Sequence, residues 1–341
     1  MIASHWKQAA AAVVVAMAAA LPAAAQSTKA ELDGTKPAGF PPSQPPEITV
    51  VYPAGGGADV TARLLARTME EVSGHKYVVN NRTGGAGMIG HTWLATQAPK
   101  DGTALGMVVS LVWGDAMLRG GGRWTYKDLE PIGYLNSDPL LWFVSGAGPF
   151  ASMSVKDIAQ AAKDKPGTIR VATVPGSMWD YNIDQVEANT GAKFLRVPFQ
   201  SGGAAATALL GNNVDIGLST YGEGMPYLPN GRFKAAGVAS AKRLAHAPDI
   251  PTLSETLGGE EYIWQLQRFV VVPKDVPADR KAYLSAVVRA AMKNPGLLDE
   301  YRKYGVAFDQ DLLDSPDIAG ALSKYAERER AFYIKTGRIK E

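Results

Sequence analysis

The residues best suited to chemistry lie in four short loops rich in Gly, Ser and Thr. They run from Ala54 to Asp59, from Arg82 to Gly87, from Pro175 to Asp180 and from Phe199 to Gly203. Each loop follows a run typical of a β-strand and precedes a helical pattern. Backbone N–H groups and the positive end of a helix dipole can hold a carboxylate at such a position without a fixed cation. The loops therefore predict an anion-binding site.

The arrangements needed for catalysis are absent from the sequence. Beyond the N-terminal segment the histidines are His75, His91 and His246, and none forms an i, i+4 pair or a metal-ligand cluster. Ser177 does not lie in a G-x-S-x-G elbow, and there is no phosphate-binding G-x-x-x-x-G-K-[ST] loop. The chain has no cysteine, which excludes disulfides and thiolate nucleophiles. We expect no catalytic residues, cofactor or metal, and an exported hydrolase is the less favoured alternative.

One glycine motif formally matches a dinucleotide-binding fingerprint. Gly85 to Gly90 fits G-x-G-x-x-G between a strand and a helix. An acidic residue about 20 positions later should bind the ribose, but Asp101 comes too early and Asp115 lies beyond another apolar strand, Ala104 to Val109. We interpret these glycines as a tight turn that exposes backbone N–H groups.

The charge balance argues against nucleic acid as a partner. The chain has 35 Lys and Arg against 33 Asp and Glu, and neither sign is gathered into a long block. A nucleic-acid-binding surface usually needs a clustered excess of basic residues. A small molecule is the expected ligand.

The first residues are typical of an export signal. Lys7 gives a positive start, an apolar run extends from Ala9 to Leu21, and Ala23 and Ala25 occupy the small positions before a cleavage site. A run of about 13 residues is too short to span a bilayer, which needs roughly 20. We expect residues 1–25 to be a signal peptide cleaved after Ala25, and the mature protein to be periplasmic.

The remaining chain divides into a lead-in and two lobes. Residues 26–46 are rich in Pro, Ser and Lys and predict a disordered lead-in. From Glu47 strands and helices alternate, which predicts an α/β fold with parallel sheets. A mature length of roughly 316 residues favours two domains. We assign 47–140 and 236–341 to lobe 1, and 141–235 to lobe 2.

The order and spacing of several short segments, some of them rich in glycine, are specific enough to indicate a family. The segments run from Val51 to Asp59, Val78 to Gly87, Ala98 to Gly102, Val197 to Gly203 and Pro248 to Thr252. Over residues 47 to 310 the chain resembles Bug-type receptors, the substrate-binding proteins of tripartite tricarboxylate transporters. The resemblance implies a two-lobed, type II-like periplasmic binding protein fold that closes on a carboxylate. It also implies a membrane permease as partner.

Three departures from the usual family pattern concern the ligand. Pro175 to Asp180 replaces a loop that commonly resembles Gly-Ser-x-Gly-Ser, Gln200-Ser201 replaces Lys-Gly or Arg-Gly, and Gln267 to Phe269 stands where Trp-Phe-Gly is common. The identity of the ligand therefore cannot be inferred from the family alone. Because Met178 and Trp179 replace small residues, we predict a carboxylate with a planar or apolar body, either aromatic or a short dicarboxylate.

The candidate ligand-binding residues come from these loops and from the ends of the predicted strands. They are Ala54, Gly55, Gly56, Gly57, Asp59, Arg82, Ser110, Trp113, Gly176, Ser177, Met178, Trp179, Asp180, Ser201, Gly202, Gly203, Thr220 and Tyr221. Alternative roles remain open for several of them. Asp59 and Ser177 can cap helices, Arg82 can anchor its own loop, and the aromatic residues can pack within their own lobe. For Arg268, an ordinary surface position is the alternative to a ligand contact.

The predicted function is that of a monomeric periplasmic receptor without catalytic activity. Its binding step is closure of the lobes on the solute, which it delivers to the permease. The alternative among binding proteins is a sensory receptor that presents its ligand-bound form to a signalling protein.

Overall fold

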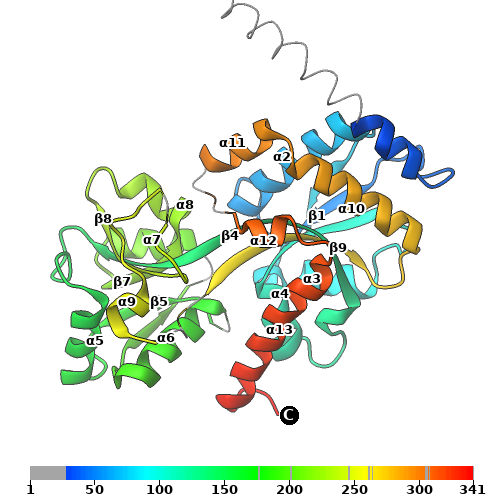
Figure 1. Ribbon diagram of the computed structural model, residues 1–341. Helices are drawn as coiled ribbons and strands as arrows, with labels where there is room; N and C mark the ends of the chain where they lie inside the picture. The colour runs from blue at the N-terminus through cyan, green and yellow to red at the C-terminus, as the bar shows by residue number, and fades with distance from the viewer. Residues whose placement is uncertain are drawn as a thin grey trace, which may run out of the picture.

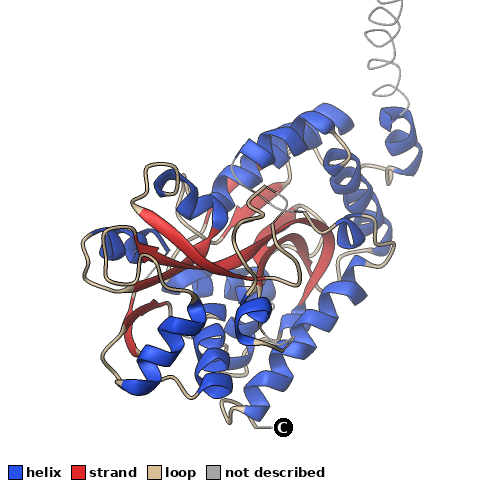
Figure 2. Ribbon diagram, turned by 60° about the vertical axis from the view of Figure 1, so that its left-hand side comes forward, coloured by secondary structure: helices blue, strands red, loops and turns tan. Residues whose placement is uncertain are grey.

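The computed structural model describes residues 28–175, 177–199, 202–244, 246–259, 262, 264–303, 306 and 308–340. The expected signal peptide and its cleavage site after Ala25 lie outside these residues. Two α/β lobes are built on one sheet with the strand order β2-β1-β3-β9-β4-β7-β5-β6, and β8 also pairs with β4 (Figure 1). Helices cover the strands on both sides (Figure 2). No helix in the described part of the chain is long and apolar enough to cross a membrane.

Lobe 1 contains the parallel strands β1 (Glu47–Val50), β2 (Val78–Asn81) and β3 (Ala104–Val109), and the antiparallel strand β9 (Gln265–Pro273) beside β3. The helices on one face are α2 (Gly57–Ser73), α10 (Ala278–Met292) and α11 (Pro295–Lys303). Those on the other face are α3 (Met88–Thr96), α4 (Leu111–Gly114), α12 (Gln310–Leu313) and α13 (Ile318–Lys335). Short helical turns occupy Gly85–Gly87, Asp115–Arg119 and Tyr126–Asp128.

Lobe 2 contains the parallel strands β5 (Arg170–Thr173), β6 (Leu195–Pro198) and β7 (Ile216–Thr220), and also β8 (Phe233–Ala239). Its helices are α5 (Val155–Asp164), α6 (Met178–Thr190), α7 (Gly202–Leu210), α8 (Tyr221–Gly224) and α9 (Leu253–Leu257), with a turn at Met225–Tyr227. The alternation of strands and helices from Glu47 onward is confirmed, as is the two-lobed fold, but the sheet is mixed and not parallel because β4, β8 and β9 pair antiparallel with their neighbours.

The 17-residue strand β4 (Leu129–Ser145) joins the lobes. Its first part, up to Pro139, pairs with β9 in lobe 1, whereas Leu140 to Ser145 pair with β7 and β8 in lobe 2. Side chains alternate between the two faces of a strand. On β9, Val270 and Val272 therefore face α2 and α10, while Phe269 and Val271 face α3 and α13. The β4–β9 pair is the crossover, and its two faces differ.

The lead-in, predicted to be disordered from residue 26 to 46, is ordered over its described part, residues 28–46. Residues 28–35 form a helix, and Leu32 and Phe40 are buried in the lobe 1 core. The Phe40 ring meets Tyr283 edge to face at 6.1 Å between centroids. Two large apolar side chains are enough to hold this otherwise polar segment on α10. The prediction used the average composition of the segment and therefore overlooked them.

The boundary of lobe 2 lies later in the chain than the sequence predicted. We expected the return to lobe 1 at residue 236, but β8 pairs with β4, and Leu253 and Trp264 belong to the lobe 2 core. The chain crosses back only at the start of β9. The sequence of β8 predicts a strand but not the lobe to which that strand belongs, because this depends on pairing with a strand far away in the sequence.

Helix α13 packs on both lobes. Ile318, Leu322 and Ala326 lie in the core of lobe 1, whereas Tyr333, two turns further on, lies in the core of lobe 2. Beyond the helix, Arg338 forms an ion pair with Asp184 of lobe 2. The C-terminal segment is thus a third link between the lobes, in addition to β4 and β9.

Candidate functional site

A cavity of about 210 Å³ lies where the lobes meet on the α2 face of the crossover. Both lobes and both crossover strands contribute to its lining, which is Gly55, Gly57, Val60, Thr61, Leu64, Asp138, Thr220, Gly222, Glu223, Arg268, Tyr301 and Val306. We call it the interlobe cavity. It has room for a small solute together with water.

Arg268 and Asp138 form a buried ion pair in the interlobe cavity. Arg268 pairs with Asn136 across the β4–β9 ladder, so Asp138, two residues further along β4, faces the same side. The Arg268 Nη1 donates to Asp138 Oδ2, and the two residues are 6% and 4% exposed. The Arg268 Nε is buried and has no hydrogen-bond partner within the described residues. The guanidinium therefore has unused donor capacity beside the cavity.

The charge of Arg268 is retained despite its burial. Burial lowers the pKa of a guanidinium, but the adjacent Asp138 carboxylate, and more weakly Glu223, raise the pKa of Arg268 above its usual value. Arg268 is therefore a permanent cation, and the alternative of an ordinary surface position for this residue is wrong.

The first turn of α2 approaches the Arg268 guanidinium closely. A Cβ atom at Gly57 would lie 3.3 Å from Arg268 Nη2, so only glycine allows this approach without crowding. The Thr61 Oγ1 donates to the Gly57 carbonyl at 2.7 Å, and the Tyr301 hydroxyl donates to the Thr61 carbonyl at 2.9 Å. These bonds fix the helix start over the ion pair, so the helix dipole and the guanidinium both favour an anion there.

Lobe 2 contributes a carboxylate to the opposite side of the interlobe cavity. Thr220 ends β7 and begins α8, and its backbone N–H and hydroxyl donate to Glu223 Oε2 at 3.1 and 3.2 Å. A Cβ atom at Gly202 would lie 3.0 Å from both Glu223 oxygens. The Glu223 carboxylate is therefore held in one position by the helix cap and by the backbone of α7.

On the α13 face of the crossover, described residues line a small cavity of about 30 Å³. Its lining includes Ser110, Trp113, Met178, Gln267 and Glu329. The Trp113 ring stacks between Phe269 at 5.6 Å and Tyr325 at 6.5 Å. Side chains nearly fill this face.

A buried carboxyl group, Glu329, lies on the α13 face. It is 6% exposed and accepts a hydrogen bond from the Tyr333 hydroxyl. Burial, with a further contribution from the charge of Asp115, raises the pKa of Glu329 to about 8. At neutral pH this side chain is mainly protonated.

The predicted site residues are distributed over both faces of the crossover. Gly55, Gly57 and Thr220 line the interlobe cavity, whereas Ser110, Trp113 and Met178 line the small cavity on the α13 face. The residues that are exposed and line neither cavity are Ala54, Gly56 and Gly203. Gly176 and Ser201 lie outside the described residues.

Asp59 and Arg82 stabilise lobe 1. Asp59 accepts hydrogen bonds from the Gly55 N–H at 2.9 Å, from Arg63 at 2.9 Å and from Asn81 at 3.0 Å. Burial raises the pKa of Asp59, but these hydrogen bonds outweigh it and hold that pKa below its usual value. The Arg82 guanidinium lies 3.8 Å from the centre of the Trp93 ring. The structure favours the alternative roles, in which Asp59 and Arg82 fix their own loops.

Three candidates in lobe 2 also have local partners. Ser177 is the N-cap of α6 and accepts from the Trp179 N–H at 3.2 Å. Asp180 accepts a hydrogen bond from Thr173. The Tyr221 ring packs against His246 at 4.4 Å. Since these contacts lie within lobe 2, they support the lobe rather than the interlobe cavity.

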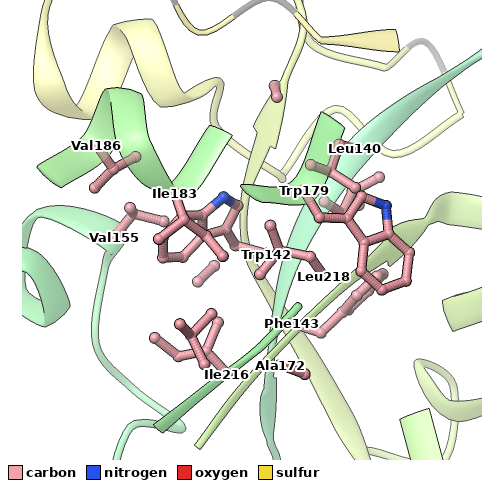
Figure 3. Close-up of a cluster of buried hydrophobic side chains, with 14 of the residues drawn as sticks. Leu140, Trp142, Phe143, Val155, Ala172, Trp179, Ile183, Val186, Ile216 and Leu218 are labelled. Atoms are coloured by element: carbon pink, nitrogen blue, oxygen red, sulfur yellow. The ribbon is translucent and has the colours of Figure 1, made fainter. Parts of the chain in front are cut away.

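Trp179, the aromatic residue predicted to cover the ligand, lies in the core of lobe 2. It is 8% exposed and belongs to the same buried cluster as Leu140, Phe143 and Leu218 (Figure 3). Its ring edge lies against Gly202, where a Cβ atom would be 3.1 Å away. The structure favours packing within its own lobe, because capping by Ser177 starts α6 at Met178 and directs Trp179 into the core.

The prediction missed the three charged residues that define the interlobe cavity. The sequence did contain a signal for two of them: Asp138 lies next to the apolar run 140–144 and Arg268 next to the apolar run 269–272, and a charge in a buried strand needs a partner. Glu223 carries the weaker signal of a capping box with Thr220. Among the described residues no group of His, Asp or Glu is arranged to hold a metal ion.

Comparison with known proteins assigns the family. Residues 61–329 match the tripartite tricarboxylate transporter family receptor, TctC. The chain belongs to this family. It is 27% identical over 294 residues to protein BugT of Bordetella pertussis, a match that covers 84% of this chain and 88% of BugT.

Solved structures of the TctC family share the fold. The periplasmic binding protein BugD superposes with a TM-score of 0.75 at 24% identity, covering 88% of this chain and all of BugD. MatC from Rhodopseudomonas palustris, solved with malate, gives 0.74 at 21% identity and covers 85% and 99% of the two chains. A second R. palustris protein, solved with adipate, gives 0.74 at 22% identity and covers 86% and 96%.

Membership of the TctC family confirms several sequence predictions. The family consists of periplasmic substrate-binding receptors of tripartite transporters and not of enzymes. The expected Bug-type resemblance and the non-catalytic role are therefore confirmed.

Proposed function

We propose that this TctC receptor binds a small carboxylate in the interlobe cavity and delivers it to the permease of a tripartite transporter. The observation that carries the proposal is the buried Arg268, whose guanidinium lies under the first turn of α2 with Nε unpaired among the described residues. A guanidinium and a helix N-terminus together suit a carboxylate. Relatives of the same fold solved with malate and with adipate support this class of ligand.

Lobe closure completes the site in this proposal. The interlobe cavity is lined by Gly55 and Gly57 from one lobe and by Thr220 and Glu223 from the other, so a bound solute bridges them. Closure of two lobes around a ligand needs only the bending of the connecting segments. Export with cleavage after Ala25 and action as a monomer are parts of the same proposal.

A thermal-shift screen of mono- and dicarboxylates tests ligand binding. A ligand at 100 times its dissociation constant adds about 2.7 kcal/mol to the free energy of unfolding. We expect at least one carboxylate to raise the melting temperature, and small-angle scattering to show compaction at saturation. If no carboxylate binds, the proposal fails.

Uptake by cells tests delivery to the permease. A strain that lacks this chain should lose uptake of the carboxylate identified by the screen, and the gene returned on a plasmid should restore it. Uptake that persists without the chain, together with a loss of the transcriptional response to the carboxylate, would favour the sensory alternative.

A further inference from the structure

We infer that the solute carries a protonated amine in addition to its carboxylate. The inference rests on the proposed function and defines the ligand class of the interlobe cavity. The charged side chains among the described residues that line it are Arg268, Asp138 and Glu223, one positive and two negative. A carboxylate alone would add negative charge to a lining that already has an excess of it.

The positive and negative groups come from different parts of the cavity. Arg268 and Asp138 belong to the crossover strands, and Arg268 lies beneath α2 of lobe 1. Glu223 belongs to lobe 2, at the start of α8. A solute with a carboxylate at one end and an ammonium nearby can contact Arg268 and Glu223 together, so that the buried guanidinium and the exposed Glu223 carboxylate each meet an opposite charge.

The hydrogen-bonding groups of the cavity also fit a solute with both a carboxylate and an ammonium group. The Arg268 Nε is buried and unpartnered within the described residues, so it can donate to a solute carboxylate. Glu223 accepts two hydrogen bonds from Thr220 through the same oxygen, Oε2. A carboxylate offers about four lone-pair sites, so Glu223 keeps acceptor capacity for an ammonium. Asp138, as the ion-pair partner of Arg268, adds a second negative group on the cavity side.

Matched pairs of ligands test the inference by titration calorimetry. The pairs are aspartate with succinate and 2-aminoadipate with adipate, which differ only in the amine. We expect the amine-bearing member of at least one pair to bind at least tenfold more tightly. If succinate or adipate binds as tightly as its amine partner, the inference is overturned while the proposed carboxylate receptor stands.

The variant Glu223→Gln identifies the group that recognises the amine. The amide oxygen can still accept from Thr220, so the helix cap is kept while the charge is removed. We expect the affinity ratio within the pair to fall to about one and the melting temperature of the ligand-free protein to stay unchanged. Glu255→Gln is the matched control, because Thr252 and Glu255 form the same capping box at α9, outside the cavity lining.

The results of the variants also separate this inference from the proposed function. A tenfold amine preference that survives in Glu223→Gln would overturn the role of Glu223. If no carboxylate binds to the unmodified protein, the proposed function fails and this inference fails with it.

Discussion

The two faces of the β4–β9 crossover use buried charge in opposite ways. On the α2 face, Arg268 and Asp138 are both charged and border a cavity of about 210 Å³. On the α13 face, Glu329 is buried beside a cavity of only about 30 Å³ and has a pKa raised to about 8. The difference is that one face keeps an ion pair beside an open cavity, while the other keeps a mainly protonated carboxyl group beside a nearly filled one.

The largest expected effect comes from breaking the ion pair on the α2 face. Arg268→Met leaves the Asp138 carboxylate buried without its cation, so we expect a loss of about 3–5 kcal/mol in the free energy of unfolding. The double variant Arg268→Met/Asp138→Leu removes both charges and should recover most of that loss. Chemical denaturation measures both values.

Measuring carboxylate affinity in the same two variants separates the role of the Arg268–Asp138 pair in binding from its role in stability. Neither variant should bind the carboxylate, because both lack the guanidinium. A double variant that is stable and binds normally would show that the Arg268–Asp138 pair serves the fold alone. Arg243→Gln, which breaks an exposed ion pair with Glu255, is the control and should retain affinity.

The second prediction concerns pH and the α13 face. The pKa of Glu329 is about 8 in the folded protein and close to 4.3 in the unfolded chain, so between these values the folded state binds more protons. The contribution of Glu329 to stability is therefore full below about pH 4 and is lost as pH rises towards 8. Relative to Glu329→Gln, the wild type should lose on the order of 4 kcal/mol between pH 4.5 and 8.

Denaturation of both proteins at several pH values checks the Glu329 prediction. Glu327→Gln on the same helix is the control, since the Glu327 side chain is exposed. A constant difference between wild type and Glu329→Gln over this range would contradict the assignment of a raised pKa.

A smaller effect is expected where α2 approaches Arg268. Gly57→Ala places a methyl group about 3.3 Å from Nη2, which crowds the guanidinium without removing it. We expect roughly a tenfold loss of carboxylate affinity, about 1.4 kcal/mol, with a stability change below about 1 kcal/mol because Ala is the better helix former. Gly203→Ala in α7 is the matched control, because a Cβ atom at Gly203 would have nothing within 4 Å.

The smallest expected effect is at the C-terminal link. Arg338 pairs with Asp184 and lies 4.9 Å from the centre of the Tyr181 ring, and both ion-pair partners are partly exposed. Arg338→Ala should cost about 1 kcal/mol. Scattering of the ligand-free protein should also show a broader distribution of interlobe distances. An unchanged distribution would mean that the packing of Phe332 and Tyr333 holds α13 on lobe 2 without Arg338.

Local patterns predicted much of the fold but little of the cavity. The strands around Ile48 and Val171, and the glycine loops after such strands, follow from period and composition alone. The Arg268–Asp138 pair joins residues 130 positions apart and exists only through the register of β4 with β9. The pattern of a single strand contains no information on that register. A charged residue next to an apolar run could therefore be recognised from the sequence, but its partner could not.

The direction of one side chain explains the main error about the ligand. Trp179 was expected at the cavity because the loop was predicted to extend to Asp180, but the helix starts at Met178 and turns Trp179 towards Leu140 and Leu218 (Figure 3). A shift of one residue in a helix start rotates a side chain by about 100°. The apolar or aromatic body predicted for the solute thus loses its main structural support.

Helix α13 restricts the bending of the crossover towards one of its two faces. The paired strands β4 and β9 alone could bend towards either face, but α13 packs across one of them, from Ile318 in lobe 1 to Tyr333 in lobe 2. Bending towards that face would compress a helix against a nearly filled interior, which resists compression. The opposite face has open volume and no such brace among the described residues. In the proposed closure, α13 therefore favours the bend that narrows the interlobe cavity around Arg268, and it sets the direction in which the lobes move.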